Sequence, residues 1–125
     1  MYELKIITRF AAAHQLKMVA KKCENLHGHN WKIEACLVGE TLNHAGVLMD
    51  FGEFKKILSE IIERLDHKFL NDLEYFNNSF APSSENIAYY IANELQASIH
   101  DPSVKVSRVT AWESENACAT YKLPA

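Results

Sequence analysis

The segment from residue 29 to residue 39 constrains the fold most strongly, because apolar and polar residues alternate along it. The apolar positions are Trp31, Ile33, Ala35 and Leu37. A period of two is typical of a β-strand with one buried face. His27 and His29 share the parity of the apolar positions, so an extended segment would point both imidazole rings to the same face. These rings could then converge on one metal ion.

The remaining segments predict an α+β chain with four strands and two helices on one face of an antiparallel sheet. The expected order is strand, strand, helix, helix, strand, strand, in one domain covering residues 1–125. The other expected strands are residues 2–13, 104–113 and 117–123, with a turn at residues 114–116. Apolar stripes at three-four spacing predict helices over residues 51–65 and from Ser83 to Ile99.

Helix-capping residues precede both expected helices. Asp50 comes directly before the first apolar stripe, with Glu53 three residues later in a capping-box pattern. We therefore interpret Asp50 as an N-cap and not as a site residue. Pro82 followed by Ser83 is the corresponding start signal of the second helix.

Three histidines and a cysteine indicate a metal site. His14 directly follows the first expected strand, and an expected loop over residues 15–26, which contains Cys23, separates it from His27 and His29. Three neutral imidazoles are the ligands of many catalytic zinc ions that keep one position open. The alternative is that these are solvated or hydrogen-bonded histidines without a metal. A structural all-thiolate zinc site is disfavoured because the sequence has no Cys-x-x-Cys pair.

A carboxylate lies next to an imidazole where the first helix should end, at Asp66 and His67. The pair could simply terminate the helix, because a cationic histidine suits a helix C-terminus. It could also transfer protons, with the acid fixing the tautomer of the base. His44 and His100, by contrast, are expected to be solvated.

Composition excludes several classes of protein. The net charge is −3 with acids and bases intermixed, which disfavours a nucleic-acid partner. No apolar run is long enough to span a membrane, and the first residues lack the layout of a signal peptide. The three cysteines lack framework spacing, so reduced thiols in a cytoplasmic protein are expected.

Taken together, the motifs resemble the family of 6-pyruvoyl-tetrahydropterin and 6-carboxy-tetrahydropterin synthases. The resemblance covers nearly the whole chain. The matching pieces, in order, are Phe10-x-Ala-Ala-His14, Cys23-x-x-x-His27-Gly28-His29, Asp50-Phe51, Asp66-His67-x-x-Leu70-Asn71, Pro82-Ser-Ser-Glu85-Asn86 and Trp112-Glu113.

The resemblance implies a tunnelling fold whose subunits pair through their sheets into a homohexameric ring of paired trimers, with active sites at subunit interfaces. It implies zinc held by His14, His27 and His29, and Cys23 as general base or acid. It implies further that Asp66 and His67 form a relay, and that Glu113 anchors the pterin. A carboxylate can accept the ring N–H and the exocyclic amine of a pterin together. Glu115 is the nearby rival for that role.

The short Cys23–His27 spacing resembles the bacterial 6-carboxy-tetrahydropterin synthases of queuosine biosynthesis. The expected reaction converts 7,8-dihydroneopterin triphosphate to 6-carboxy-5,6,7,8-tetrahydropterin, acetaldehyde and triphosphate. The alternatives are 6-pyruvoyl-tetrahydropterin synthesis by triphosphate elimination and a non-catalytic pterin- or zinc-binding module. Candidate cations for the triphosphate are Lys17, Lys21, Lys22 and Lys68.

Overall fold

The computed structural model describes residues 1–16, 26–77 and 79–124. Cys23 and three of the candidate lysines, Lys17, Lys21 and Lys22, lie outside the described residues. All six histidines and Glu113 lie within them.

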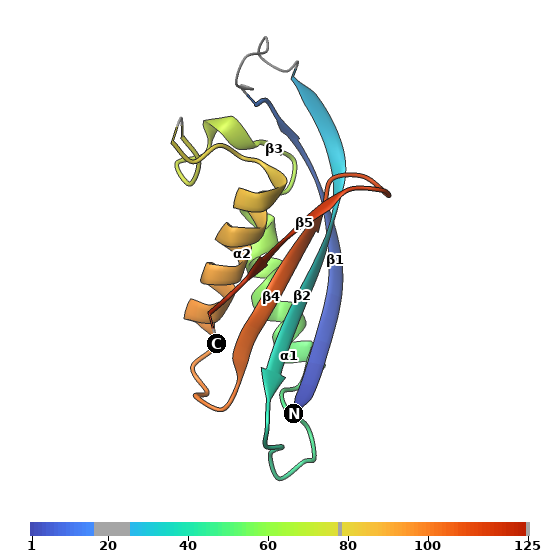
Figure 1. Cartoon of the computed structure of the whole chain (residues 1–125), viewed down its shortest axis with the longest axis vertical. Coiled ribbons are helices and arrows are strands. Elements are labelled where there is room, and N and C mark those ends of the chain that lie inside the picture. The colour runs from blue at the N-terminus through green and yellow to red at the C-terminus, as the bar shows by residue number, and fades with distance from the viewer. Residues whose placement is uncertain (17–25, 78, 125) are drawn as a thin grey trace.

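A mixed β-sheet forms one layer of the molecule (Figure 1). Its strands are β1 (Tyr2–His14), β2 (His27–Gly39), β3 (Lys68–Phe69), β4 (Lys105–Trp112) and β5 (Cys118–Lys122). The strand order across the sheet is β3-β1-β2-β4-β5. The α+β class is confirmed, but the predicted sheet of four antiparallel strands is wrong. The short β3 adds a fifth strand, and it pairs parallel to β1 through Ala12 and Ala13.

The register of β1 against β2 assembles the histidines. The two strands are antiparallel and pair along their whole lengths, from Tyr2 opposite Gly39 to His14 opposite His27. β2 therefore begins at His27, two residues before the predicted start of this strand at residue 29. This pairing brings the end of one strand and the beginning of the next to the same end of the sheet.

Two helices cover one face of the sheet, as Figure 1 shows. Helix α1 is Phe51–Glu63, helix α2 is Ser84–Ser98, and a short 3-10 helix, η1, covers Leu70–Asp72. The side chain of Ser83 accepts a hydrogen bond from the backbone N–H of Asn86, which caps α2 as predicted. Helix α1 ends two residues before the predicted residue 65, because the chain turns there toward β3.

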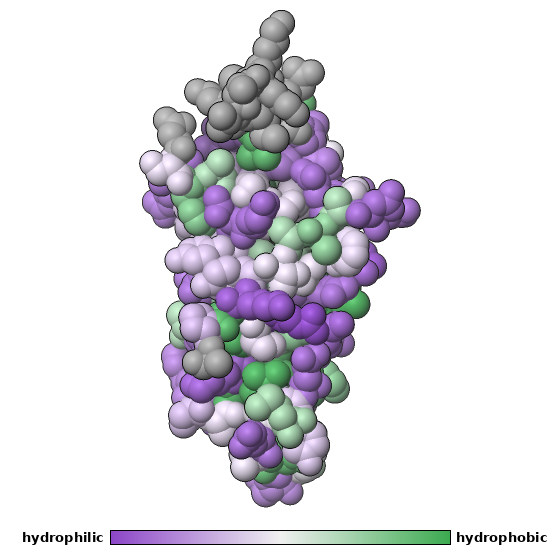
Figure 2. Space-filling view, in the orientation of Figure 1, coloured by the Kyte–Doolittle hydropathy of each residue, from purple (hydrophilic) through white to green (hydrophobic). Residues whose placement is uncertain are grey.

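The core lies between the helices and the sheet. Alternate residues of β1 and β2 are buried against the helices, including Phe10, Trp31 and Ile33. The surface on the side shown in Figure 2 is largely hydrophilic, with apolar residues in small separate patches. Burial of alternate strand residues follows the two-residue period of the sequence.

Loss of the α1 cap is expected to destabilise the fold measurably. The Asp50 carboxylate accepts a hydrogen bond from the backbone N–H of Glu53 at 3.0 Å. Asp50→Ala removes this acceptor and should lower the free energy of unfolding by about 1 kcal/mol. Asp50→Ser, which keeps a capping oxygen, should lose much less. Urea denaturation of both variants would check this, and equal losses would contradict the capping role.

Candidate metal centre

His14 is the fully buried member of the histidine cluster. It ends β1, and its side chain has no solvent exposure. Its Nδ1 lies 2.7 Å from the carbonyl oxygen of Pro82. A carbonyl can only accept, so Nδ1 carries the proton and donates it. In the neutral ring, Nε2 is then an acceptor, and it lies 3.1 Å from Nε2 of His27.

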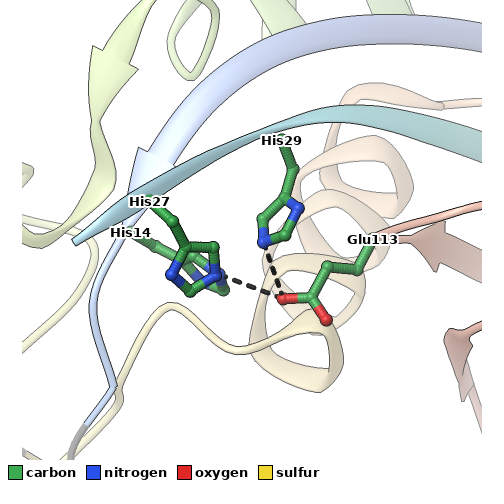
Figure 3. Close-up of side chains that lie close together, drawn as sticks. All are labelled: His14, His27, His29 and Glu113. Carbon is green, nitrogen blue, oxygen red and sulfur yellow. Dashed lines mark hydrogen bonds and ion pairs between the residues drawn. The ribbon is translucent and has the colours of Figure 1, made fainter. Parts of the chain in front are cut away.

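His27 and His29 lie on β2 and point to the same face of the strand, as their spacing predicts. Their ring centroids are 4.4 Å apart. The ring of His14 lies 4.7 Å from that of His27 and 5.1 Å from that of His29. The structure therefore brings the three predicted zinc ligands together at one end of the sheet (Figure 3).

Glu113 completes this cluster. It follows β4 directly, and its Oε1 lies 3.0 Å from Nε2 of His14 and 3.2 Å from Nε2 of His29 (Figure 3). One ligand atom from each of the four residues, His14, His27, His29 and Glu113, lies within 4.8 Å of the others. Sequence reasoning assigned Glu113 to the pterin and missed its contact with the imidazoles. The buried β2–β4 pairing, which sets this contact, has no local signal in the sequence.

The donor set of the cluster fits a divalent transition metal. Imidazole nitrogens and a carboxylate oxygen are ordinary zinc ligands. The hydrogen bond from His14 Nδ1 to Pro82 fixes the ring so that Nε2 faces the cluster, which is how a second partner orients a metal-binding histidine. The residues present could therefore hold the metal that the sequence predicts.

Asp66 and His67 form a second, separate cluster beside β1. Oδ1 of Asp66 accepts a hydrogen bond from the backbone N–H of Ala11 at 3.0 Å and lies 3.0 Å from Nδ1 of His67. The His67 side chain is 81% exposed, and its backbone has a φ of 59°. A left-handed conformation costs a residue with a Cβ about 1–2 kcal/mol. The hydrogen bond from the His67 backbone N–H to the Ala11 carbonyl helps to hold it.

His67 also lines a neighbouring cavity. The Asp66 carboxylate can accept Nδ1–H of His67, which leaves Nε2 of the ring as a proton acceptor. His67 and His29 both line a cavity of about 490 Å³, together with Lys68 and Gly28. His67 and His29 thus share one cavity, but Asp66 and His67 are not part of the group of candidate metal ligands.

The acid stability of the fold should depend on Asp66. The Ala11 N–H, and to a lesser extent His67, lower the pKa of this carboxyl from its ordinary value of 3.8. A lowered folded pKa contributes stability that is present above the unfolded pKa and is lost as the pH falls through the folded one. Asp66→Asn should therefore lose less stability than the wild type as the pH falls below about 4.

Urea midpoints measured at a series of acidic pH values would check this, with Asp72→Asn in η1 as the matched control. The amide oxygen of the introduced asparagine can still accept from Ala11, so the geometry is retained while the titration is removed. Parallel pH profiles for the wild type and Asp66→Asn would contradict the assignment.

The two described cysteines lie away from the histidines. Cys36 is buried near the other end of β2, opposite Lys5, and burial raises the pKa of its thiol. Cys118 is exposed at the start of β5. Neither residue belongs to the cluster of candidate ligands found among the described residues. Cys23 therefore remains the cysteine of interest on sequence grounds.

A second cavity lies beside Glu113. It has a volume of about 640 Å³, and its lining includes Trp112, Glu113, Glu115 and Lys32. The Lys32 ammonium lies 5.4 Å from the centre of the Trp112 ring. Both rival carboxylates for the pterin therefore line one cavity, and of the two only Glu113 also belongs to the histidine cluster.

Within the described part of the chain, no helix is both long and apolar enough to cross a membrane.

Comparison with known proteins identifies the relatives of the chain. The sequence model described as 6-pyruvoyl tetrahydropterin synthase matches residues 3–124. The 6-carboxy-5,6,7,8-tetrahydropterin synthase of Aquifex aeolicus is 29% identical, with 81% of this chain and 76% of that protein covered. The dihydroneopterin monophosphate aldolase of Pyrococcus furiosus is 35% identical, with 83% and 82% covered. The structure of Caenorhabditis elegans 6-pyruvoyl tetrahydropterin synthase matches with a TM-score of 0.85 and 29% identity, covering 98% of this chain and 96% of that one.

Proposed function

The chain belongs to the 6-pyruvoyl tetrahydropterin synthase family, and within it we propose that the chain is a zinc-dependent 6-carboxy-5,6,7,8-tetrahydropterin synthase. The proposed reaction takes 7,8-dihydroneopterin triphosphate and water to 6-carboxytetrahydropterin, acetaldehyde and triphosphate, as a step toward queuosine. The observation that carries the proposal is the convergence of three imidazoles beside a cavity that a carboxylate also lines. A pocket of this kind is the default position for a small-molecule substrate.

His14, His27 and His29 would hold the zinc ion. Bound zinc would act as a Lewis acid on the oxygens of the pterin side chain and so ease loss of protons from the neighbouring carbons. The ring of His14 is buried and held in place by the Pro82 carbonyl. A metal-binding side chain that is held by its surroundings keeps the site in one geometry.

Cys23 would move protons at the substrate side chain, and the Asp66–His67 pair would raise its reactivity. A thiolate near a metal and an imidazole is a competent base near neutral pH. The contact between Asp66 and His67 supports the relay, because it orients the imidazole ring. Glu113 would accept the ring N–H and exocyclic amine of the pterin.

The chain would work as a single tunnelling-fold domain in a cytoplasmic homohexamer with active sites at subunit interfaces. Two features of the structure support assembly through the sheets. The described part of β1 before Ala12 pairs only with β2, and β5 pairs only with β4, so both have a free edge. His67 is also largely exposed, which would leave it accessible to a neighbouring copy.

Three reactions compete within this family, and the relatives carry all three names. The proposed branch rests on the three residues between Cys23 and His27 and on the Aquifex relative. The C. elegans structure supports triphosphate elimination to 6-pyruvoyl-tetrahydropterin as an alternative. The Pyrococcus relative supports a retro-aldol cleavage of a dihydroneopterin phosphate. A non-catalytic pterin- or zinc-binding module is the remaining alternative.

Product identification separates these alternatives. The zinc-loaded protein would be incubated with dihydroneopterin triphosphate and, in parallel, with dihydroneopterin monophosphate, with and without a chelator, and the products analysed by mass spectrometry. The proposal predicts acetaldehyde and a carboxylated pterin, formed only with metal. A pyruvoyl pterin would indicate the elimination reaction. A hydroxymethyl pterin with a phosphorylated two-carbon aldehyde would indicate the aldolase. No turnover of any pterin phosphate would reject all three enzymes.

Replacing Cys23 tests its catalytic role. We expect Cys23→Ala to lower kcat at least about a hundredfold, since general acid–base catalysis is typically worth that much. Zinc content and the urea midpoint should stay at wild-type values, because the histidines hold the metal. Cys118→Ala is the control at an exposed thiol. Full turnover by Cys23→Ala would remove this residue from the mechanism.

A further inference from the structure

Glu113 contacts the imidazoles in a way that anchoring a pterin does not explain. Its Oε1 lies 3.0 Å from His14 Nε2 and 3.2 Å from His29 Nε2. We infer that Glu113 is the fourth protein ligand of the metal, and that it closes the site when no substrate is bound. This inference rests on the proposed function only in taking the three histidines as ligands.

The ring of His14 is oriented so that Nε2 faces the Glu113 carboxylate. Its Nδ1–H is committed to the Pro82 carbonyl, so Nε2 of the neutral ring presents a lone pair to the Glu113 carboxylate. Two acceptors this close repel each other unless a positive charge lies between them. A divalent ion between these atoms would bind the carboxylate and all three rings at once.

The spacing of the ligand atoms matches a four-coordinate site. Bonds of about 2.0–2.1 Å to zinc place tetrahedral ligand atoms roughly 3.3 Å apart. Three separations are 3.0 Å, 3.1 Å and 3.2 Å, namely Glu113 to His14, His14 to His27, and Glu113 to His29. All three are close to that value. Three imidazoles and one carboxylate thus supply four ligand atoms, and these three separations fit a tetrahedral zinc site.

Glu113 can leave the cluster without disturbing the fold. Its backbone N–H donates to the Ala117 carbonyl at 3.1 Å, which holds the main chain at the start of the β4–β5 turn. The side chain is 31% exposed and also lines the 640 Å³ cavity beside Trp112. Rotation of the side chain alone would carry the carboxylate toward this cavity. Closing the metal site and holding a pterin are therefore compatible roles of one side chain.

Zinc affinity measured without substrate tests the inference. Competition with a chromophoric chelator would compare the wild type with Glu113→Gln, which keeps the size of the side chain and removes its charge. Glu115→Gln, in the same turn and lining the same cavity, is the matched control. We expect Glu113→Gln to bind zinc at least about tenfold more weakly, since even indirect partners of metal ligands contribute that much. Glu115→Gln should match the wild type.

Cobalt substitution gives a second readout. The wild type loaded with Co²⁺ should show the intense visible bands of a four-coordinate ion, and Glu113→Gln should show altered bands. Wild-type zinc affinity together with an unchanged cobalt spectrum in Glu113→Gln would overturn the inference, as would failure of the wild type to bind zinc. Because no pterin is present, a chain that binds zinc through Glu113 but turns over no pterin would refute the proposed function alone.

Discussion

His14→Ala is expected to abolish zinc retention and pterin turnover together. The substitution removes a proposed ligand whose two ring nitrogens both have partners, one the Pro82 carbonyl and the other His27. It also leaves the Pro82 carbonyl without its partner in a region closed to solvent, which costs about 1–3 kcal/mol of folding free energy. Because metal binding adds to the stability of the folded state, the loss should be larger in the presence of zinc.

Three measurements would follow this variant: the zinc-to-protein ratio after dialysis, kcat/KM with dihydroneopterin triphosphate, and the urea midpoint with and without zinc. His44→Ala is the matched control, because His44 is exposed in the loop after β2. It should behave as the wild type in all three. A His14→Ala protein that keeps wild-type zinc affinity would contradict the assigned metal centre, whatever its activity.

Periodicity predicts which face of a strand is buried, and it did so for β1 and β2. The parity shared by His29, Trp31 and Ile33 placed the imidazoles on the face that the helices cover. The register between β1 and β2 was not predictable in this way. His14 stands opposite His27 only in the observed pairing. A slip of one residue would turn one strand's side chains to the other face, so the register depends on long-range packing.

The elements that sequence analysis missed are those that have no local pattern. β3 has only two residues, Lys68 and Phe69, too few to show any period. It pairs with β1 because the turn after α1 places it beside that strand. A hydrogen bond from the His67 backbone N–H to the Ala11 carbonyl holds this turn. The contact of Glu113 with His14 and His29 likewise arises from β4 lying beside β2. Contacts of this kind follow from the assembled sheet and not from neighbouring residues.

Trp31 lies between the hydrophobic core and the candidate metal centre. Its replacement by alanine is the second substitution for which we expect a large effect. The side chain is fully buried, stacked on Phe10 at 6.1 Å between ring centroids. Its ring also meets His14 edge-on at 5.2 Å and His29 at 5.4 Å. Trp31→Ala should lower the free energy of unfolding by about 3–5 kcal/mol, as removal of a buried aromatic ring does. Zinc affinity should fall as well, because the rings of His14 and His29 lose the packing contact that orients them.

Trp31→Phe separates packing from hydrogen bonding. Among the described residues, Nε1 of Trp31 has no hydrogen-bond partner. Phenylalanine therefore gives up no protein hydrogen bond there and keeps a ring between Phe10 and the histidines. We expect it to retain most of the stability and zinc affinity that Trp31→Ala loses, as measured by urea unfolding of the metal-free protein and by chelator competition. If Trp31→Ala unfolded easily yet bound zinc as tightly as the wild type, the indole would support the core alone, and the histidine rings would have to be oriented by Pro82 and Glu113.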